Sequence, residues 1–245
     1  MKRLVLMLCL TVPLAVSAQK ITWMVKGGPS INNVWSGLSG GDTRFGGRFG
    51  IGLEYQVNRT FSIQPSLMMS FKGNKSTNEK EVIYYDQGNV SSYKYDKKTY
   101  KYGENYLEIP IDAQFRIHFR RNNSLTFAVG PYFAYGIGGK TKYSRIYAYE
   151  KFNPYENQLV NYDGNITYTE TVAKYSTFGR EGANLHRFDM GINEEIHFEF
   201  NRFMLGVYTE YGLLKLDKNH ESNELYNFLL HGKNVSYGLD LGYRF

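Results

Sequence analysis

The last eleven residues of the chain, VSYGLDLGYRF, constrain its fold more than any other segment. One face of this segment is aliphatic or aromatic: Val235, Tyr237, Leu239, Leu241, Tyr243 and Phe245. The other face carries small or charged residues: Ser236, Gly238, Asp240, Gly242 and Arg244. This two-residue period predicts a β-strand that stops on an aromatic residue. In a soluble sheet the apolar face would meet a core. In an outer-membrane barrel it would meet lipid, and the polar face would line the interior.

The N-terminus has the parts of a secretory signal peptide. Two basic residues precede an apolar run, Leu4–Val16, which is followed by small residues up to Ala18. The apolar run is too short for a transmembrane anchor and is interrupted by a threonine and a proline. We therefore expect cleavage after Ala18, which divides the chain into a signal peptide (1–18) and one β-barrel domain (19–245).

The residue content excludes several classes of site. The single cysteine, Cys9, lies inside the signal segment, so the mature chain has no thiol for a disulfide, a thiolate metal site or a nucleophile. No paired-histidine helix motif or calcium loop is present, and we expect no metal and no cofactor. The net charge of +6 is mild and no dense basic run occurs, which argues against nucleic acid as a partner.

The mean hydropathy of −0.45 is typical of soluble proteins, but it does not exclude a barrel. Lipid-facing and lumen-facing residues alternate in a barrel strand, so their hydropathies cancel. Aromatic residues make up 16% of the chain, with 22 tyrosines, and tyrosine is favoured at membrane interfaces.

Alternation of this kind recurs along the mature sequence and predicts eight strands. Their expected ranges are 21–30, 45–56, 61–72, 106–119, 125–138, 185–200, 203–214 and 235–245. Glu194 breaks the apolar face of the sixth strand. Pro65 and Pro110 fall inside two others, where they predict bulges or misplaced strand boundaries. Eight is the smallest usual strand count for an outer-membrane barrel.

The connections between these strands alternate in length. Tight turns are expected at residues 56–60, 120–124 and 201–202, and long segments lie between them. The long segments are 31–44, 73–103, 139–184 and 215–232. Short turns at one rim and long loops at the other match the periplasmic and extracellular ends of a bacterial barrel. The sequence thus predicts an all-β fold, an eight-stranded antiparallel transmembrane barrel in the outer membrane, with outer-membrane lipid around it.

The polar faces of the strands predict a charged interior. The expected lumen network consists of Arg48, Glu54, Glu108, Asp112, Arg116, Arg187, Asp189, Glu195, Glu210, Asp240 and Arg244. An eight-stranded barrel is about wide enough for such side chains to fill it, so we expect ion pairs rather than an open channel. A narrow ion or proton path is the alternative. A soluble barrel or sandwich would require the two faces to be reversed, because burying so many charges in a soluble core is costly.

Several segments together resemble the PorT-like outer-membrane β-barrel family of Bacteroidetes. They are FGGRFGIGLEYQVNRTFSIQPSLMMSFKGNK, YLEIPIDAQFRI, LTFAVGPYFAYGIGGK, FMLGVYTEYGLLKL and GLDLGYRF, which cover every predicted strand except the first and the sixth. The resemblance implies insertion by the barrel-assembly machinery, which recognises a C-terminal aromatic residue such as Phe245. The family's namesake is implicated in type IX secretion, which makes an accessory role in that pathway one candidate function.

The two largest loops contain 13 of the 22 tyrosines. Many of these recur at even spacing and are interspersed with lysines, which predicts protruding hairpins that continue the strands. Tyrosine gives a large contact area at low entropic cost, so these residues are candidate contacts for a protein or glycan. They are Tyr93, Tyr95, Tyr100, Tyr102, Tyr143, Tyr147 and Tyr149. The alternative is a stiff rim in which the tyrosines stack on each other.

Enzymatic function is the weakest expectation. The histidines are His118, His186, His197, His220 and His231, and none lies in a motif that fixes a nucleophile or an orienting carboxylate. The sequence therefore favours a non-catalytic membrane anchor whose loops contact an envelope or secretion protein or another ligand. A narrow channel and an outer-membrane enzyme are the alternatives.

Overall fold

The computed structural model describes residues 21–35, 42–86, 89–120, 123–151, 169–178, 185–216 and 232–245. These residues form twelve β-strands. In this part of the chain no helix has the length and apolarity needed to cross a membrane. The predicted signal peptide and its cleavage site lie outside the described residues.

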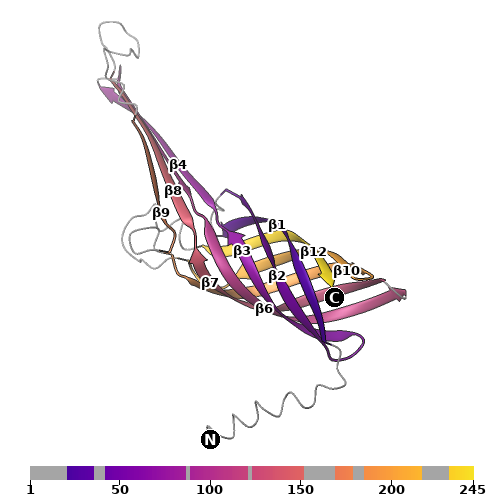
Figure 1. Ribbon diagram of the computed structural model, residues 1–245. Helices are drawn as coiled ribbons and strands as arrows, with labels where there is room; N and C mark the ends of the chain where they lie inside the picture. The colour runs from indigo at the N-terminus through magenta and orange to yellow at the C-terminus, as the bar shows by residue number, and fades with distance from the viewer. Residues whose placement is uncertain are drawn as a thin grey trace, which may run out of the picture.

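Eight of the strands close into one barrel (Figure 1). They are β1 (Ile21–Trp35), β2 (Arg44–Gln56), β3 (Phe61–Lys72), β6 (Glu104–Arg120), β7 (Asn123–Gly138), β10 (Phe188–Phe200), β11 (Phe203–Gly212) and β12 (Lys233–Arg244). Their order around the wall is β1-β12-β11-β10-β7-β6-β3-β2, and every neighbouring pair is antiparallel. The predicted fold class is confirmed.

The strand bounds differ from the predicted ones mainly at the ends. The first strand extends to Trp35, five residues beyond the expected range, and the sixth barrel strand begins at Phe188 rather than at 185. In the first strand, two consecutive glycines and a proline obscure the alternation, although the ladder with β2 runs through them.

The two faces of the wall have opposite character. Apolar side chains such as Trp23, Phe49 and Leu239 are more than half exposed on the outside, whereas Arg48 and Glu195 on the inside are 2% exposed. A soluble barrel would place these faces the other way round, so that alternative is wrong. The outer belt is the surface that meets lipid.

Both internal prolines lie within strands, so the strand boundaries were not misplaced there. Pro65 of β3 lies opposite Ile111, and Pro110 of β6 lies opposite Tyr132. In each ladder the pairing is interrupted over the next two residues, as expected where proline removes an amide donor. The register shifts of β6 fall elsewhere, so the predicted bulges at the prolines are not found.

One end of the barrel has short connections and holds the C-terminus. Asn58 Oδ1 accepts bonds from the amides of Thr60 and Phe61 in the β2–β3 turn. Asn201 has a φ of 54° in the two-residue β10–β11 turn, where asparagine tolerates the left-handed region. The amide of Phe245 donates to the carbonyl of Trp23 (3.0 Å), which ties the C-terminus to the start of β1. Short turns mark this end as periplasmic.

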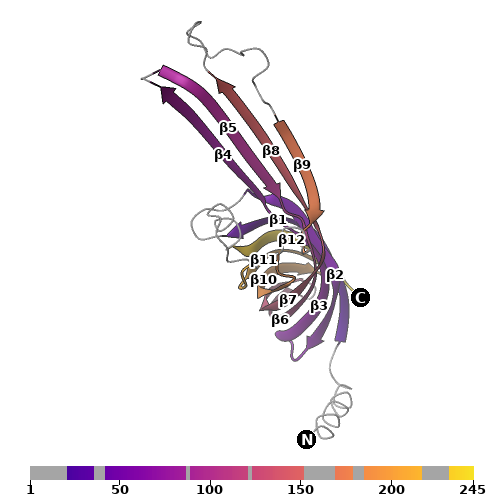
Figure 2. The same ribbon diagram turned by 90° about the vertical axis from the view of Figure 1, so that its left-hand side faces the viewer.

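A second sheet rises from the opposite, extracellular end (Figures 1 and 2). Its strands are β4 (Lys75–Asp86), β5 (Asn89–Lys101), β8 (Lys140–Lys151) and β9 (Thr169–Ser176), in the order β4-β5-β8-β9. The predicted protruding hairpins are therefore confirmed. Pairing between β5 and β8 joins them into one sheet, which the local periodicity did not indicate.

Glycines form two of the joints between barrel and sheet. Gly73 links β3 to β4 and has a φ of 139°, and Gly139 links β7 to β8 with a φ of 144°. A Cβ at Gly73 would lie 2.1 Å from the carbonyl oxygen of Tyr102, and one at Gly139 would lie 2.0 Å from that of Gly103. Both the backbone conformation and the available space therefore require glycine.

Glu194 lies in the middle of β10 on the lipid-facing side, between Val129 of β7 and Thr209 of β11. A carboxylate near the middle of the lipid belt is unfavourable, though less so than a lysine or arginine. We expect Glu194→Leu to raise the free energy of unfolding by about 1–2 kcal/mol in lipid vesicles. Glu194→Gln is the matched control for loss of charge. A leucine variant that is less stable than wild type would contradict this account.

Candidate functional site

Arg48 bridges the lumen from one wall to the opposite wall. It projects from β2 and binds Glu195 of β10 (2.5 Å), Glu210 of β11 (2.7 Å) and Asp240 of β12. In the barrel order β2 and β10 are diametrically opposite. The guanidinium also lies 3.4 Å from the ring centroid of Tyr208. One fully buried cation therefore joins three strands across the middle of the barrel.

Two lysines extend this network, and neither is among the residues predicted for the lumen. Lys26 of β1 binds both oxygens of Glu195 at 2.7 Å. Lys72 of β3 lies 2.6 Å from Glu108 and 2.8 Å from Glu210, which again crosses to the opposite wall. Strand parity could have found both residues, because Lys26 alternates with the outward face of β1 and Lys72 shares the polar face of β3.

A separate group of charges closes the periplasmic end. Arg116 binds Glu54 (2.7 Å) and Glu199 (3.2 Å), and Arg244 binds the same two carboxylates at 2.9 and 2.8 Å. The hydroxyl groups of Ser124 and Thr126 donate to Glu199 as well. A polar vestibule of about 490 Å³ opens beside these residues at the rim.

The extracellular end of the lumen contains acids without a nearby arginine. Asp189 accepts hydrogen bonds from Tyr132 (3.1 Å) and Asn234 (3.0 Å), and Glu104 accepts one from Tyr106 (3.0 Å). One oxygen of each carboxylate lacks a hydrogen-bond partner in the described structure.

Arg187 is the member of the expected lumen network that does not join the ion pairs. It precedes β10, donates to the carbonyl of Gly136 (2.7 Å) and lies over the ring of Phe178 (5.6 Å). It forms no salt bridge with a described residue. Arg187 lies at the mouth of the barrel, just before β10 begins. It is therefore outside the regular alternation that directs the acidic side chains of β10 into the lumen.

The described lumen is acidic as a whole. Nine carboxylates point inward: Glu54, Glu104, Glu108, Asp112, Asp189, Glu195, Glu199, Glu210 and Asp240. Five permanent cations accompany them: Lys26, Arg48, Lys72, Arg116 and Arg244. Asp112 shows the consequence, because one of its oxygens accepts from Asn193 (3.0 Å) while the other is unpartnered. The lumen cations therefore neutralise some of these carboxylates and leave others, such as Asp112, without an ion pair among the described residues.

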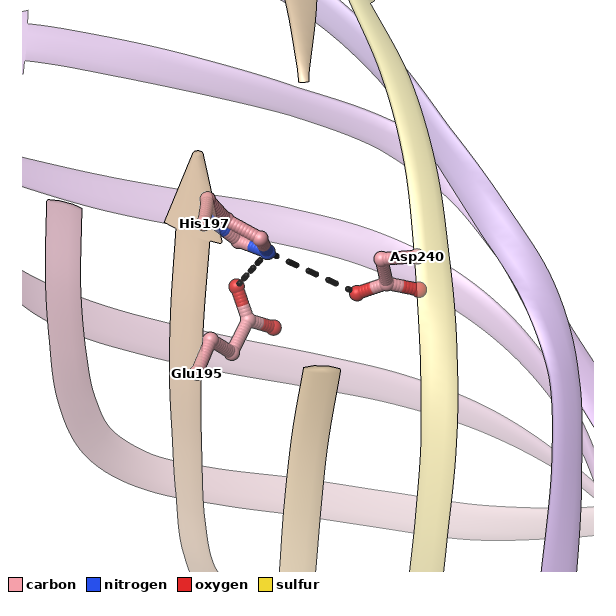
Figure 3. A group of neighbouring side chains, drawn as sticks. All are labelled: Glu195, His197 and Asp240. Atoms are coloured by element: carbon pink, nitrogen blue, oxygen red, sulfur yellow. Dashed lines mark ion pairs between the residues drawn. The ribbon is translucent and has the colours of Figure 1, made fainter. Parts of the chain in front are cut away.

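The donor set most similar to a metal site lies within this network (Figure 3). His197 Nε2 lies 3.4 Å from Glu195 and 3.9 Å from Asp240. Both carboxylates are already bound by Arg48, and Lys26 occupies both oxygens of Glu195. A metal ion would have to displace two buried cations, so the arrangement fits a structural ion-pair network better than a metal centre.

The tyrosines at the base of the extracellular sheet pack together. Tyr100 stacks on Tyr102 (6.2 Å between centroids) and lies 4.8 Å from Tyr143. Tyr102 is 3% exposed and belongs to the apolar cluster at the barrel mouth with Tyr106 and Phe178. This burial contradicts its prediction as a contact for an external ligand.

The other candidate tyrosines lie farther out. Tyr147 and Tyr149 share one face of β8, and Tyr93 and Tyr95 lie on the other face of the sheet. Arg145 lies 5.3 Å from the ring of Tyr147. The hydroxyl of Tyr95 donates to Glu79 (2.6 Å). These side chains are partly exposed, so they stay candidate contacts.

Side-chain pairs stiffen the sheet across its strands. Arg145 of β8 forms two hydrogen bonds to Asp96 of β5, at 2.8 and 2.9 Å. These bonds hold the pKa of the Asp96 carboxyl below its usual range. Hydrogen bonds from Tyr95 and then Lys97 lower the pKa of Glu79 in the same way. Both acids are therefore ionised at neutral pH and connect neighbouring strands.

The two outer strands of the sheet have edges with few partners. Within the described residues, the free side of β4 is paired only at Lys75, by a bridge to Asp42. Farther along β4, four consecutive large side chains are exposed, from Val82 (39%) to Tyr85 (65%). On the other edge Val172 of β9 is 59% exposed. Such edges are surfaces on which another strand can pair.

At the C-terminus, Phe245 lies against Tyr243 with 5.3 Å between ring centroids, and Tyr243 contacts Phe203. These three aromatic rings are at the periplasmic end, where an interfacial girdle is expected. The role of Phe245 in assembly stays a prediction.

Comparisons with known structures return bacterial outer-membrane barrels. The attachment invasion locus protein Ail of Yersinia pestis, solved in complex with the heparin analogue sucrose octasulfate, is 14% identical with a TM-score of 0.39; the match covers 92% of this chain and 99% of Ail. Neisserial surface protein A is 9% identical with a TM-score of 0.35, covering 92% and 99%. An outer-membrane channel from Pseudomonas putida F1 is 9% identical with a TM-score of 0.27, covering 92% and 95%. No curated protein matches the sequence.

A family model described as "Outer membrane protein beta-barrel domain" matches residues 17–218, which is most of the chain. This description does not specify the PorT-like family or Bacteroidetes, which stay predictions from the resemblance. Its match agrees with the closed eight-stranded wall and with the apolar outer belt, and it places the protein in a bacterial outer membrane. The chain belongs to the outer membrane protein β-barrel domain family.

Proposed function

We propose that this protein is a non-catalytic outer-membrane anchor whose extracellular sheet binds a protein partner along the edge of β4. The carrying observation is the outer backbone edge of β4, which beyond Lys75 has no strand partner among the described residues and lies beside the exposed run Val82–Tyr85. A partner strand added there would satisfy the backbone groups of β4, and its side chains would pack on Ile83 and the tyrosines.

The rigidity of the sheet supports this function. The pair Asp96–Arg145 holds β5 to β8, and the cluster at the base of the sheet, against which Tyr100 packs, fixes the sheet to the barrel. Little ordering entropy is therefore lost on binding. A sheet that serves only as a rim needs no apolar edge, and natural proteins usually protect such edges.

The barrel itself favours an anchor over a channel or an enzyme. Arg48 and Lys72 span the lumen between opposite strands, which opposes conduction through the middle of the barrel. His197 is 2% exposed and surrounded by ion-paired groups, so a substrate has no access to it. Substantial and reproducible single-channel conductance from the pure protein would contradict the anchor function.

Site-specific photo-crosslinking in intact cells tests the proposal. A photoreactive residue at Val82 is expected to give one discrete adduct, and the same residue at Val172 on the β9 edge is the matched control. Ile83→Lys together with Tyr85→Lys should abolish the Val82 adduct, because charges on an edge strand oppose pairing. Val172→Lys should leave it intact. The PorT-like resemblance makes envelope and secretion proteins the first identities to check.

Equal adducts at Val82 and Val172, or an adduct at Val82 that survives the two lysines, would contradict edge binding. Heat-modifiable migration on a denaturing gel confirms that each variant still forms the barrel.

A further inference from the structure

Four lysines form a single row across the base of the extracellular sheet. Lys75 lies directly opposite Lys101, Lys101 opposite Lys142, and Lys142 opposite Lys174. Each of the four strands contributes one lysine. Residues directly opposite in a ladder share a face, so all four side chains leave the sheet on the same side.

This row is electrostatically unfavourable in isolation. Neighbouring strands lie about 4.8 Å apart, and like charges directly opposite each other destabilise a sheet. Lys75 is compensated by Asp42 at 3.0 Å. Lys101, Lys142 and Lys174 are exposed and form no ion pair with a described residue. Three adjacent charges therefore have no counterion within the described structure.

The row points away from the barrel mouth. Tyr100, the neighbour of Lys101 on β5, leaves the opposite face and packs against the cluster over the mouth. Tyr143, the neighbour of Lys142 on β8, shares the face of Tyr100 and contacts its ring. Successive side chains of a strand point to opposite faces, so the lysines are directed outward.

The row also lies just above the lipid-facing belt. Phe71 is on the outer face near the extracellular end of β3, and Lys75 begins β4 four residues later, at most about 13 Å along the chain. Headgroups occupy the zone beyond the hydrocarbon core, and a lysine side chain can reach several ångströms toward it.

We propose that Lys101, Lys142 and Lys174, with Lys75 beside them, dock the phosphate groups of outer-leaflet lipid. The phosphates supply the missing counterions, and the docking fixes the base of the sheet against the membrane surface. This surface is on a different part of the sheet from the outer edge of β4, so it does not depend on partner binding there.

The test uses the full folded protein in neutral detergent, titrated with diphosphorylated lipid A and read by native mass spectrometry. K101Q/K142Q/K174Q is expected to weaken binding on the order of a hundredfold, since each lysine near an anionic surface contributes about fivefold to tenfold. The matched control K80Q/K94Q/K98Q makes the same charge change on the opposite face of the sheet, farther from the membrane. It should bind within about threefold of wild type.

Three further results complete the test. Lipid A without phosphates should not bind, inorganic phosphate at millimolar concentration should not displace lipid A, and K142Q alone should weaken binding about fivefold. The single variant keeps the test decisive if the triple variant does not fold. Equal binding by the row variants and wild type, binding of dephosphorylated lipid A, or displacement by inorganic phosphate would each overturn the proposal.

Discussion

Replacing Arg48 with methionine is expected to lower the free energy of unfolding by about 3–5 kcal/mol. The substitution keeps much of the side-chain volume but leaves Glu195, Glu210 and Asp240 facing one another without their shared cation. Removal of one partner from a buried ion pair costs more than removal of both, because the remaining charges stay desolvated. Urea unfolding in lipid vesicles, followed by heat-modifiable migration, measures the loss.

Two variants separate charge from packing at this position. Arg48→Lys keeps the charge but cannot bind several carboxylates in the planar fork of arginine, so it should recover only part of the stability. Arg48→Met combined with Asp240→Asn should also recover part, because Glu195 keeps Lys26 and Glu210 keeps Lys72, whereas Asp240 is left without a permanent cation. If Arg48→Met is as stable as wild type, the cross-lumen network does not hold the barrel together.

The strand faces could be predicted because apolar and polar residues alternate along each barrel strand, with the apolar residues outside and the polar residues inside. In β12, Tyr237 and Leu239 face outward and Asp240 faces inward, as the alternation at the C-terminus indicates. The choice between lipid and a soluble core on the apolar side depended on the signal segment, the terminal Phe245 and the alternating connection lengths. These features are local, so they can be read from the order of residues.

Contacts across the lumen could not be predicted in the same way. Arg48 and Glu195 are 147 positions apart, and only closure of the barrel brings β2 and β10 face to face. The merger of two hairpins through β5 and β8, and the resulting lysine row, depend on register between distant segments. Tyr102 was misassigned for the same reason, since its burial comes from the cluster at the mouth and not from its neighbours in sequence.

Strand continuity connects the two halves of the molecule. β3, β6 and β7 lie in the barrel wall, and one or two residues connect each of them to a strand of the extracellular sheet: β3 to β4, β5 to β6, and β7 to β8. A force applied to the sheet would therefore act directly on these barrel strands. Ion pairs in the lumen connect two of them, β3 and β6, to other strands of the wall. An interior closed by ion pairs agrees with the proposed anchor function, whereas a channel would need the same space open.

Asp112→Asn is expected to act in the opposite direction to Arg48→Met and to raise the free energy of unfolding by about 1–3 kcal/mol. Asp112 is fully buried, its Oδ2 has no hydrogen-bond partner, and no described cation lies within salt-bridge distance. The amide oxygen of asparagine can still accept from Asn193, so the change removes a charge and keeps the shape.

Glu210→Gln is the matched control for Asp112→Asn, because it makes the same chemical change at a carboxylate that binds both Lys72 and Arg48. It should lower stability by about 3 kcal/mol or more. Both variants are measured by urea unfolding in vesicles at pH 8, where free carboxyl groups are ionised. If the free energy of unfolding rises in Asp112→Asn and falls in Glu210→Gln, the excess of acids destabilises the barrel through specific unpaired carboxylates such as Asp112. A loss of stability in Asp112→Asn as large as that in Glu210→Gln would show instead that Asp112 is compensated as fully as the ion-paired acids.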